Sequence, residues 1–486
     1  MKYMNKSISE LHQLLVDKVV TPLDLTKEAI ELAKANNDNA FEYIAEKEAL
    51  EFASTLVEPE IDNLLWGIPF VAKDNLSTKD IPTTGSSDIL KGYTPIFDSE
   101  VVKRLKDSKA ILIGKTTLDE LAMGGSGTTG HLGISYNPWD PTHTRHVGGS
   151  SCGSAIAASA AIVPFALGSD TGDSVRKPAS YVGLVGLKPT WGRISRWGLF
   201  PFATSLDHVA YFTRNVKDSA ILLNVLAGRD EKDSTSSLKP VDDYLSNLNG
   251  DIKGLKIAVI KEIADTLDDE ELLNKFNNTI ALLKEKGAII DYVSVNEKLL
   301  LSLYPTYMVI SCAEATSNNA NLDGIKFGLR ESGESYQEIM TNTRSKGFSE
   351  LIKRRFIIGS YSLLKENQTE LFLRAQKARR LLVDAINKVL EEYDFIYTPA
   401  ATSVAPLFND KSLDKTSAKY LIGENHLGIA NFAGLPSITL PIAIKDGLPF
   451  GANFTARAFE ETKLFQIASC LEEITGLKDI YAKEDK

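Results

Sequence analysis

Apolar positions near the start of the chain recur with the spacing of amphipathic helices. From residue 8 to 19 they fall three or four positions apart, and the same pattern runs from 23 to 35. Thr21-Pro22 between the two runs is a helix-start signal. We therefore expect residues 1–58 to form a helical segment that packs on a second, much larger unit, residues 59–486.

Short apolar runs in that larger unit predict strands, and amphipathic stretches between them predict helices. Residues 300–392 are mainly helical in pattern, and the Ala-rich stretch 155–167 is interpreted as a buried core helix. Alternation of this kind favours an α/β fold with one mixed, twisted sheet and helices on both of its faces. The predicted strands are 67–72, 110–113, 255–260, 288–292, 394–397 and 437–444, with a helix at 270–286.

Composition narrows the classes of protein. The chain has 486 residues, 43% of them apolar, which is enough for a substantial core. Its formal charge of −10 makes direct binding of nucleic acid through its own surface unfavourable, so any nucleic acid is expected on a partner. Three cysteines without paired spacing argue against disulfides and zinc. We expect a cytoplasmic protein with no metal site and no membrane span.

Gly, Ser and Thr are dense at residues 124–130 and 148–174, where the chemistry is expected. Gly148-Gly149-Ser150-Ser151-Cys152-Gly153-Ser154 is followed by thirteen mostly apolar residues and then by Gly168-Ser169-Asp170-Thr171-Gly172-Asp173-Ser174. Ser150 and Ser174 lie 24 residues apart, and Lys73-Asp74-Asn75 follows a predicted strand. In these three features the chain resembles the amidase signature family. The resemblance implies a single amidase-signature domain with its core at about 65–230 and a helical insertion on the substrate side at about 300–392.

A serine hydroxyl needs a base to become a nucleophile, and a lysine can act as that base only when its ammonium form is destabilised. Lowering a lysine pKa from ~10.4 to ~7 costs about 4.6 kcal/mol, which burial can supply. The resemblance implies that Lys73 is neutral, that Ser150 follows a cis peptide bond and relays the proton, and that Ser174 attacks. It places Ser151, Asp170 and Arg176 around this triad. His208, which follows Asp207, is an alternative base for a serine.

Backbone N–H groups of Thr171, Gly172 and Asp173 are expected to stabilise the developing oxyanion. Asp173 departs from the family, which usually has glycine there, and Cys152 also replaces a glycine or serine. A carboxylate ~5 Å from the oxyanion would oppose it by ~3 kcal/mol at an effective dielectric constant of ~20. Either Asp173 turns away, toward a cation such as Arg176, with Lys177 also close by in the sequence, or activity suffers.

Several passages narrow the resemblance to the glutaminase subunits of tRNA-dependent amidotransferases. Glutamine carries a carboxylate and an ammonium group, so its pocket needs one cation and one anion. The resemblance puts Arg355 on the carboxylate with Tyr307 beside it, Glu424 on the ammonium, and Gly124 and Ser126 in the substrate-binding set. Lys353 and Arg354 are left as surface groups. The passages are 118–126, 185–205, 207–219, 306–318 and 347–359.

The same resemblance implies partners. Two further subunits are expected: a B-type kinase and transferase, which uses ATP and Mg²⁺ and binds most of the misacylated tRNA, and a small C-type subunit. No cofactor is expected in this chain, and the choice between Glu-tRNA(Gln) and Asp-tRNA(Asn) as acceptor belongs to the partner. Two other interpretations stay open, a free-standing amidase acting on another small amide and an inactive scaffold in which Asp173 has ended catalysis.

Overall fold

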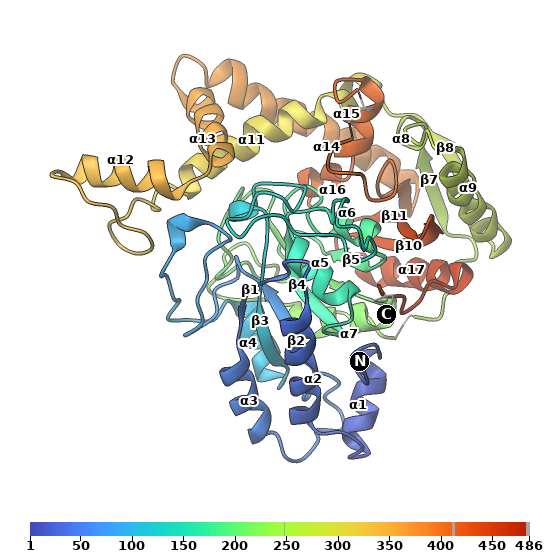
Figure 1. The fold of residues 1–486 in the computed structure, drawn as a ribbon. Coiled ribbons are helices and arrows are strands. Elements are labelled where there is room, and N and C mark those ends of the chain that lie inside the picture. The colour runs from blue at the N-terminus through green and yellow to red at the C-terminus, as the bar shows by residue number, and fades with distance from the viewer. Residues whose placement is uncertain (247, 411–413, 483–486) are drawn as a thin grey trace.

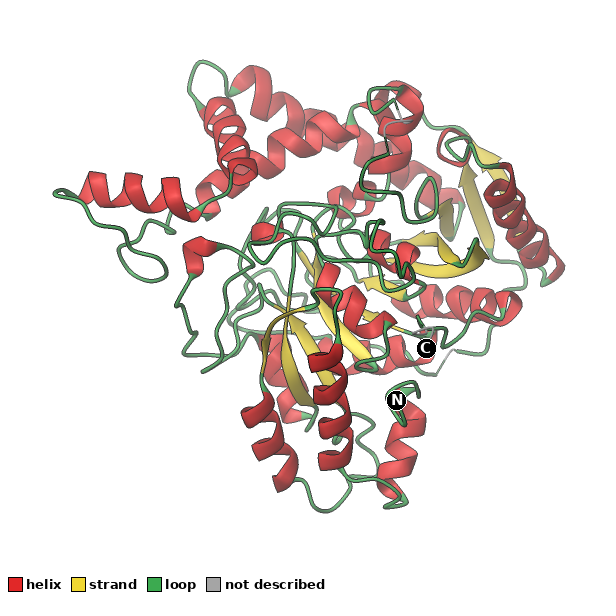
Figure 2. Ribbon diagram, in the orientation of Figure 1, coloured by secondary structure: helices red, strands yellow, loops and turns green. Residues whose placement is uncertain are grey.

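One large mixed sheet organises the molecule. The computed structural model describes residues 1–246, 248–410 and 414–482, and within these eleven strands pair in the order β1-β3-β2-β4-β6-β5-β10-β11-β9-β7-β8. Figure 2 shows strands in yellow and helices in red. The strands are β1 (Phe41–Ile44), β2 (Pro69–Lys73), β3 (Ile111–Thr116), β4 (Phe165–Asp170), β5 (Val185–Lys188), β6 (His208–Thr213), β7 (Lys256–Ile260), β8 (Ile289–Val293), β9 (Phe395–Pro399), β10 (Ser437–Lys445) and β11 (Leu448–Ala456). The predicted α/β fold with a mixed sheet is confirmed.

The strands that matter most for the site are β3, β2 and β4, which run parallel side by side. Every residue of these three strands is buried, as expected for parallel strands that are covered on both faces. The remaining pairs from β4 through β6, β5, β10 and β11 to β9 are antiparallel, and β9, β7 and β8 are parallel again. The carboxyl ends of β2 and β4 therefore lie next to each other.

Helices flank this sheet and also form an arm that projects from it (Figure 1). Those of the first half are α1 (Ile8–Val16), α2 (Pro22–Ala35), α3 (Glu46–Thr55), α4 (Glu100–Asp107), α5 (Cys152–Ser159), α6 (Arg176–Val182), α7 (Val216–Leu226), α8 (Lys261–Ala264) and α9 (Glu270–Glu285). Those of the second half are α10 (Glu297–Leu301), α11 (Leu303–Asn318), α12 (Tyr336–Gly347), α13 (Glu350–Leu363), α14 (Arg374–Glu392), α15 (Ala418–Asn425), α16 (Gly428–Ala433) and α17 (Glu461–Thr475). Short helical turns lie at Asp88–Leu90, Glu120–Ala122 and Thr369–Leu373.

The N-terminal helices form where the sequence signals predict them. Thr21 caps α2: its side chain accepts a hydrogen bond from the Asp24 N–H, and the Asp24 side chain accepts one from the Thr21 N–H. Pro22 is the first residue of the helix. The sequence analysis missed strand β1, which lies inside this segment and pairs antiparallel with β3 at the edge of the sheet. The N-terminal segment is thus tied to the sheet by a strand as well as by helices.

The interpretation of residues 155–167 as one buried helix is wrong in its second half. Helix α5 ends at Ser159, and β4 begins at Phe165 directly after Pro164. Proline disfavours helical backbone in the residue before it, and Ala161 has a positive φ of 51°. The apolar residues after this break lie between β2 and β6 in the sheet. Helix α5 and strand β4 are both buried on all sides, so both are rich in apolar residues, and composition alone could not tell them apart.

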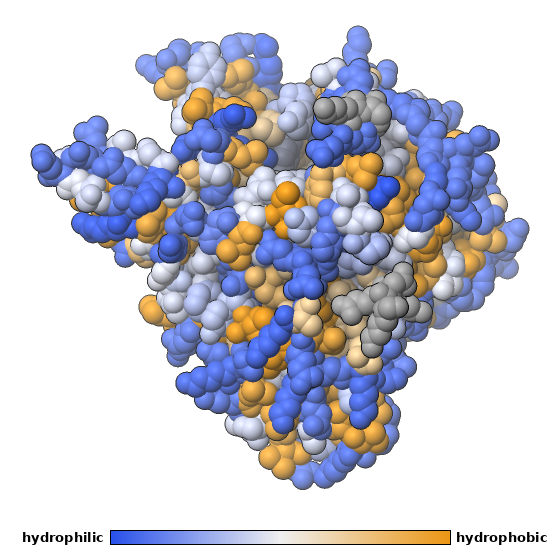
Figure 3. All heavy atoms as spheres, viewed as in Figure 1, coloured by the Kyte–Doolittle hydropathy of each residue, from blue (hydrophilic) through white to orange (hydrophobic). Residues whose placement is uncertain are grey.

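The helices between 297 and 392 form a second core of their own. Their apolar residues pack with the β7 residues Ala258 and Ile260 and with Phe202, apart from the larger core around the central strands. In Figure 1, α11, α12 and α13 extend away from the sheet, and hydrophilic side chains predominate on the visible surface around α12 (Figure 3). Among the described residues, no helix combines the length and apolar character that crossing a membrane requires.

Candidate active site

The candidate site lies where β2 and β4 end. Lys73 is the last residue of β2 and Asp170 the last residue of β4, and Ala72 pairs with Leu167 across the two strands. Loops that follow the carboxyl ends of parallel strands meet at one edge of a sheet. The register therefore brings Lys73 beside Ser169, although the two are 96 positions apart in the sequence.

The Lys73 ammonium position is surrounded by hydroxyl groups. Lys73 Nζ lies 2.7 Å from Ser150 Oγ, 2.9 Å from Ser151 Oγ and 2.9 Å from Ser169 Oγ. These three serines are called the hydroxyl cluster below. Each hydroxyl can donate or accept a hydrogen bond, so the hydroxyl cluster accommodates a neutral amine as well as an ammonium. Lys73 is completely buried.

Burial decides the charge of Lys73. It lowers the pKa of Lys73 to about 7, against the weaker opposing attraction of Cys152, Asp119 and other more distant groups. Loss of solvation disfavours the charged form of a lysine, and hydroxyl groups replace that solvation only in part. A substantial fraction of Lys73 is therefore a neutral amine at neutral pH, which is the state a base needs.

Ser150 and Ser174 enter the site from two loops that are joined by a backbone contact. The peptide bond between Gly149 and Ser150 is cis, and the Ser151 N–H donates to the Ser174 carbonyl at 3.2 Å. Ser174 is 4% exposed, so its side chain lies just beneath the surface. Ser150 Oγ contacts Lys73 Nζ at 2.7 Å, and the backbone contact between Ser151 and Ser174 holds the two serine loops together.

The loop from Thr171 to Ser174 has free donors. Among the described residues, the backbone N–H groups of Thr171, Gly172, Asp173 and Ser174 donate to no partner. The loop is held instead through its other atoms: Thr171 Oγ1 donates to Asp207 Oδ1 at 2.7 Å. Backbone N–H groups without a partner in the protein are the kind of donor that can stabilise a developing oxyanion.

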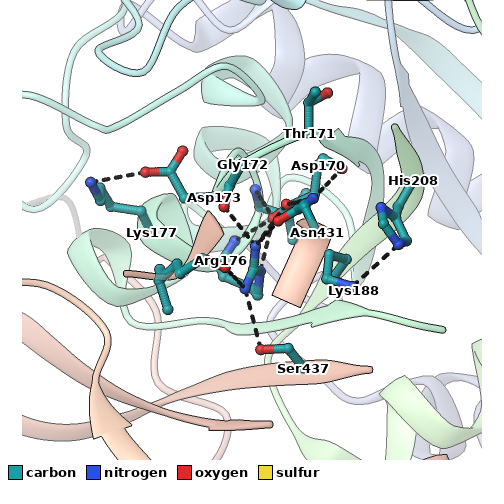
Figure 4. Close-up of polar contacts among 12 residues, drawn as sticks. Asp170, Thr171, Gly172, Asp173, Arg176, Lys177, Lys188, His208, Asn431 and Ser437 are labelled. Atoms are coloured by element: carbon teal, nitrogen blue, oxygen red, sulfur yellow. Dashed lines mark hydrogen bonds and ion pairs between the residues drawn. The ribbon is translucent and has the colours of Figure 1, made fainter. Parts of the chain in front are cut away.

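Arg176 fixes the loop from Thr171 to Ser174 through several hydrogen bonds. It donates to both Asp170 carboxylate oxygens, at 3.1 and 2.9 Å, and to the Gly172 carbonyl at 2.8 Å (Figure 4). It also reaches Asn431 Oδ1 at 2.6 Å and Ser437 Oγ at 3.3 Å. Burial alone would raise the pKa of Asp170, but the Arg176 guanidinium holds it well below its usual range. The pair is a buried ionic support for the loop, with neither side chain exposed to solvent.

The Asp173 carboxylate pairs with Lys177 and not with Arg176, the other cation close to it in the sequence. Its Oδ2 lies 2.8 Å from Lys177 Nζ, one helical turn further on, whereas Arg176 is fully occupied with Asp170 and its neighbours (Figure 4). Lys177 Nζ also lies 3.2 Å from Glu424 Oε2 and donates to the Glu424 carbonyl at 2.6 Å. Asp173, Lys177 and Glu424 are called the charge cluster below.

The two carboxyl groups of the charge cluster respond differently to their surroundings. Burial raises the pKa of Asp173 in spite of Lys177. Burial also acts to raise the pKa of Glu424, but Lys177 and a hydrogen bond from Thr402 Oγ1 at 2.9 Å lower it overall. The two carboxylates together hold the pKa of Lys177 well above its ordinary value although burial opposes them. The two carboxylates therefore favour the ammonium form of Lys177.

A cleft of about 560 Å³ opens above the loop. Gly124 and Gly172 line it, together with all three members of the charge cluster and with Tyr307 and Arg355 from the helical arm. The Tyr307 ring packs so closely on Gly172 that a Cβ atom there would lie 3.2 Å from Cε2 of the ring. Ser174 directly follows Asp173, which lines the cleft. The cleft thus joins residues of the sheet loops to residues of α11 and α13.

Arg355 presents a cation to this cleft. Its guanidinium lies over the Phe202 ring at 5.6 Å from the centroid, and its buried Nη1 has no hydrogen-bond partner in the described part of the chain. A buried donor without a partner is costly, so Arg355 is suited to an anionic ligand group. Arg354, which the sequence analysis left as a surface group, is exposed but also lines the cleft. Lys353 pairs with Glu350 on the helix surface.

Ser126 does not line the main cleft but a neighbouring hollow of about 240 Å³. Its Oγ is hydrogen-bonded to Thr128 Oγ1 at 2.7 Å. Its N–H donates to Asp119, whose carboxylate also receives the N–H groups of Gly127, Thr128 and Thr129. One buried carboxylate thereby fixes the whole Gly-rich loop that carries Gly124 into the cleft.

Sequence reasoning missed two residues that organise the site, Ser169 and Asp119. Ser169 contacts Lys73, and its place directly before Asp170 in the Gly-Ser-Asp-Thr-Gly run was the available signal. Asp119 precedes the glycine-rich loop, and an aspartate beside a run of Gly, Ser and Thr can serve as a common acceptor for loop N–H groups. For Asp173, the signal that favoured Lys177 over Arg176 was its i,i+4 spacing, which is that of a helical ion pair.

His208 is not placed as a base. It is buried, its Nδ1 lies 2.7 Å from the Leu206 carbonyl oxygen, and its Nε2 lies 3.3 Å from Lys188 Nζ. Both ring nitrogens therefore have partners other than a serine. In the described part of the chain no three His, Cys, Asp or Glu side chains gather as they would around a metal ion.

Comparisons with known proteins agree with this geometry. The model of the amidase family matches residues 24–465, so the chain belongs to the amidase family. It is 40% identical over 494 residues to the A subunit of glutamyl-tRNA(Gln) amidotransferase from Pediococcus pentosaceus, covering 100% of both chains. The corresponding protein of Streptococcus pneumoniae, which carries the same name, is 40% identical over 482 residues, 98% of this chain and 97% of that one.

A solved structure gives the same relation. The crystal structure of the A subunit of glutamyl-tRNA(Gln) amidotransferase from Thermotoga maritima superposes with a TM-score of 0.80 at 36% identity. The superposition covers 97% of this chain and 96% of that one. The resemblance that the sequence motifs indicated is therefore confirmed.

Proposed function

We propose that this chain is the glutaminase subunit of a tRNA-dependent amidotransferase. The observation that carries the proposal is the buried Lys73 amine within hydrogen-bond distance of Ser150, beneath a loop with free backbone donors. Full-length relatives that are named as the A subunit of glutamyl-tRNA(Gln) amidotransferase support the choice of reaction.

In the proposed mechanism, neutral Lys73 takes the proton of Ser150 while Ser150 takes the proton of Ser174. Ser174 Oγ then attacks the side-chain amide carbon of glutamine, and the carbonyl oxygen becomes an oxyanion held by the N–H groups of Thr171, Gly172 and Asp173. The relay returns the proton to the leaving nitrogen, which departs as ammonia. Water then attacks the acyl-enzyme by the same relay and releases glutamate.

The proposed glutamine pocket is the cleft above this loop. Arg355 Nη1 has no hydrogen-bond partner in the described part of the chain, which suits it to the substrate carboxylate, and Tyr307 lies beside it. The Glu424 carboxylate, which keeps the negative charge of the aspartate more usual in the family, binds the substrate ammonium. One cation and one anion on two sides of the cleft select an amino acid with a side-chain amide over a simple amide.

The ammonia is proposed to reach a partner subunit that activates the carboxylate of Glu-tRNA(Gln) or Asp-tRNA(Asn) with ATP and Mg²⁺. Binding of tRNA belongs mainly to that B-type partner, with a small C-type subunit completing the complex, since this chain carries a net charge of −10. No cofactor is proposed for this chain. The complex is proposed to act in the cytoplasm, where tRNA is charged.

The test separates ammonia production from its use. Ser174→Ala in the complete complex is expected to abolish glutamine-dependent amidation of tRNA and to leave amidation with added ammonium salt intact, because only the ammonia source is removed. Ser54→Ala, at an exposed position on α3, is the matched control and should change neither activity. Loss of both activities in Ser174→Ala would contradict the division of labour.

Two further results would favour the other interpretations. Hydrolysis of a small amide without any effect of the partner subunits would indicate a free-standing amidase. Failure of the wild-type chain to form an acyl-enzyme with a glutamine analogue would indicate an inactive scaffold.

A further inference from the structure

The charge cluster contains one more carboxylate than an ammonium pocket needs. Asp173 and Glu424 each lie within 3.2 Å of the single Lys177 ammonium. Two carboxylates and one ammonium leave a net charge of −1, the same as a lone carboxylate. The cluster can therefore neutralise one substrate ammonium, provided that Lys177 keeps both of its partners.

The geometry assigns Lys177 more closely to Asp173 than to the Glu424 carboxylate. The Asp173 contact is 2.8 Å, against 3.2 Å to Glu424 Oε2, and the shorter contact with Glu424 is made to its backbone carbonyl at 2.6 Å. The Lys177 N–H also donates to the Asp173 carbonyl at 2.9 Å, which places the two side chains one helical turn apart on the same face. Glu424 Oε1 is held separately by Thr402.

We propose that Lys177 is a positioning and specificity-determining residue: it serves as the counter-ion of Asp173, and this pairing leaves Glu424 available to the ammonium of the substrate. The proposal rests on the proposed function, because glutamine supplies that ammonium. Lys177 thus affects both the oxyanion donors beside Asp173 and the ammonium-binding carboxylate of Glu424, which belong to different parts of the chain. It keeps the Asp173 charge from opposing the oxyanion, and Asp173 keeps Lys177 from neutralising Glu424.

Each half of the pair is therefore expected to fail in its own way. In Asp173→Asn, Lys177 is left to neutralise Glu424, so KM for glutamine rises about tenfold, the value of one charge-assisted contact. In Lys177→Gln, the Asp173 carboxylate is uncompensated beside the oxyanion donors, so kcat falls about tenfold or more. Asp173→Asn with Lys177→Gln removes both charges and is expected to come within about threefold of the wild type in both constants.

The experiment is a double-variant cycle in the complete complex with two substrates. Glutamine carries the α-ammonium, and glutaramate is the same amide without its amino group. Asp173→Asn should raise KM for glutamine and leave KM for glutaramate unchanged, whereas Lys177→Gln should lower kcat for both. Lys103→Gln is the matched control, because Lys103 forms an i,i+4 pair with Asp107 on the exposed surface of α4, and it should change nothing.

Three outcomes would overturn the assignment: effects that simply add in the double variant, an equal rise in KM for both substrates in Asp173→Asn, or an unchanged kcat in Lys177→Gln. Lys177→Met serves as a second neutral variant if Lys177→Gln does not fold, as judged by its melting temperature. If the wild-type complex hydrolyses neither amide, the proposed function itself is contradicted, and the role of Lys177 falls with it.

Discussion

Two lysines lie within one site and carry opposite charge states. Lys73, in the hydroxyl cluster, has its pKa lowered to about 7 by burial. Lys177, in the charge cluster, has its pKa raised well above the ordinary value by Asp173 and Glu424, although burial acts against them. Lys73 is 0% exposed and the Lys177 side chain 8%, so burial differs little between them.

The difference lies in what replaces water. Hydroxyl groups solvate an amine without favouring its charged form, whereas carboxylates within about 3 Å favour the ammonium strongly. One residue type therefore supplies a base in one region and a fixed cation in the other. Which of these a buried lysine becomes is decided by its neighbours on other strands and helices.

The largest expected effect on activity comes from replacing Lys73 by arginine, a change that Lys177 should tolerate. Lys73→Arg is expected to lower kcat/KM for glutamine at least about a thousandfold, because a guanidinium cannot act as a base at any useful pH. Ammonia release in the complete complex measures it, with Lys73→Ala for comparison. Retention of a tenth of the activity would show that Lys73 is needed only as a charge.

The second effect concerns stability. The folded-state pKa of about 7 lies below the ordinary 10.5, so the unfolded chain binds more protons between these values and stability rises with pH there. The cost of burying Lys73 is full below pH 7 and vanishes above pH 10.5. Lys73→Met is therefore expected to raise the free energy of unfolding at pH 7 by up to about 5 kcal/mol.

Urea denaturation at pH 7 and pH 10 measures this stabilisation, with Lys103→Met on the exposed surface as the control. The gain should shrink at the higher pH. An equal gain at both values would mean that the methionine simply packs better and that the charge of Lys73 is not involved.

A third effect is the dependence of the rate on pH. Because the neutral amine is the active form of Lys73, kcat/KM should fall about tenfold for each pH unit below 7 and level off above it. Initial rates of glutamine hydrolysis between pH 5 and 9 give the profile. An inflection absent from this range would place the base elsewhere.

The smallest effect is expected in the charge cluster. Lys177→Arg keeps the positive charge between Asp173 and Glu424, so kcat and KM for glutamine should each change by less than about fivefold. The comparison with Lys73→Arg is made in one assay. A collapse of activity in Lys177→Arg would mean that the shape of the ammonium, and not only its charge, is required.

The sequence predicted the elements whose signals are local. The apolar run that ends at Lys73 predicted strand β2, and the Thr21-Pro22 signal predicted helix α2. Strand β1 was missed because four half-buried residues at the sheet edge carry no clear alternation. Strand β4 was taken for a helix because a fully buried strand and a buried helix share one composition.

The site divides in the same way. Serine and lysine positions in the motif run could be named from the sequence, whereas the partner of Asp173 could not be chosen between Arg176 and Lys177. That choice depends on Asp170, which already occupies Arg176, and on Glu424, which lies 247 positions from Lys177. Contacts over such distances in the chain follow from the sheet order and leave no local pattern.

The long-range hydrogen bonds of Arg176 affect when the site can form during synthesis on the ribosome. Its hydrogen bonds to Asn431 and Ser437 span 255 and 261 positions, and β5 finds its neighbour β10 only when residues 437–439 have been made. Contacts of such high sequence separation form late. A nascent chain therefore contains Ser174 long before the loop around it can be fixed, and the nucleophile stays unassembled until synthesis is nearly complete.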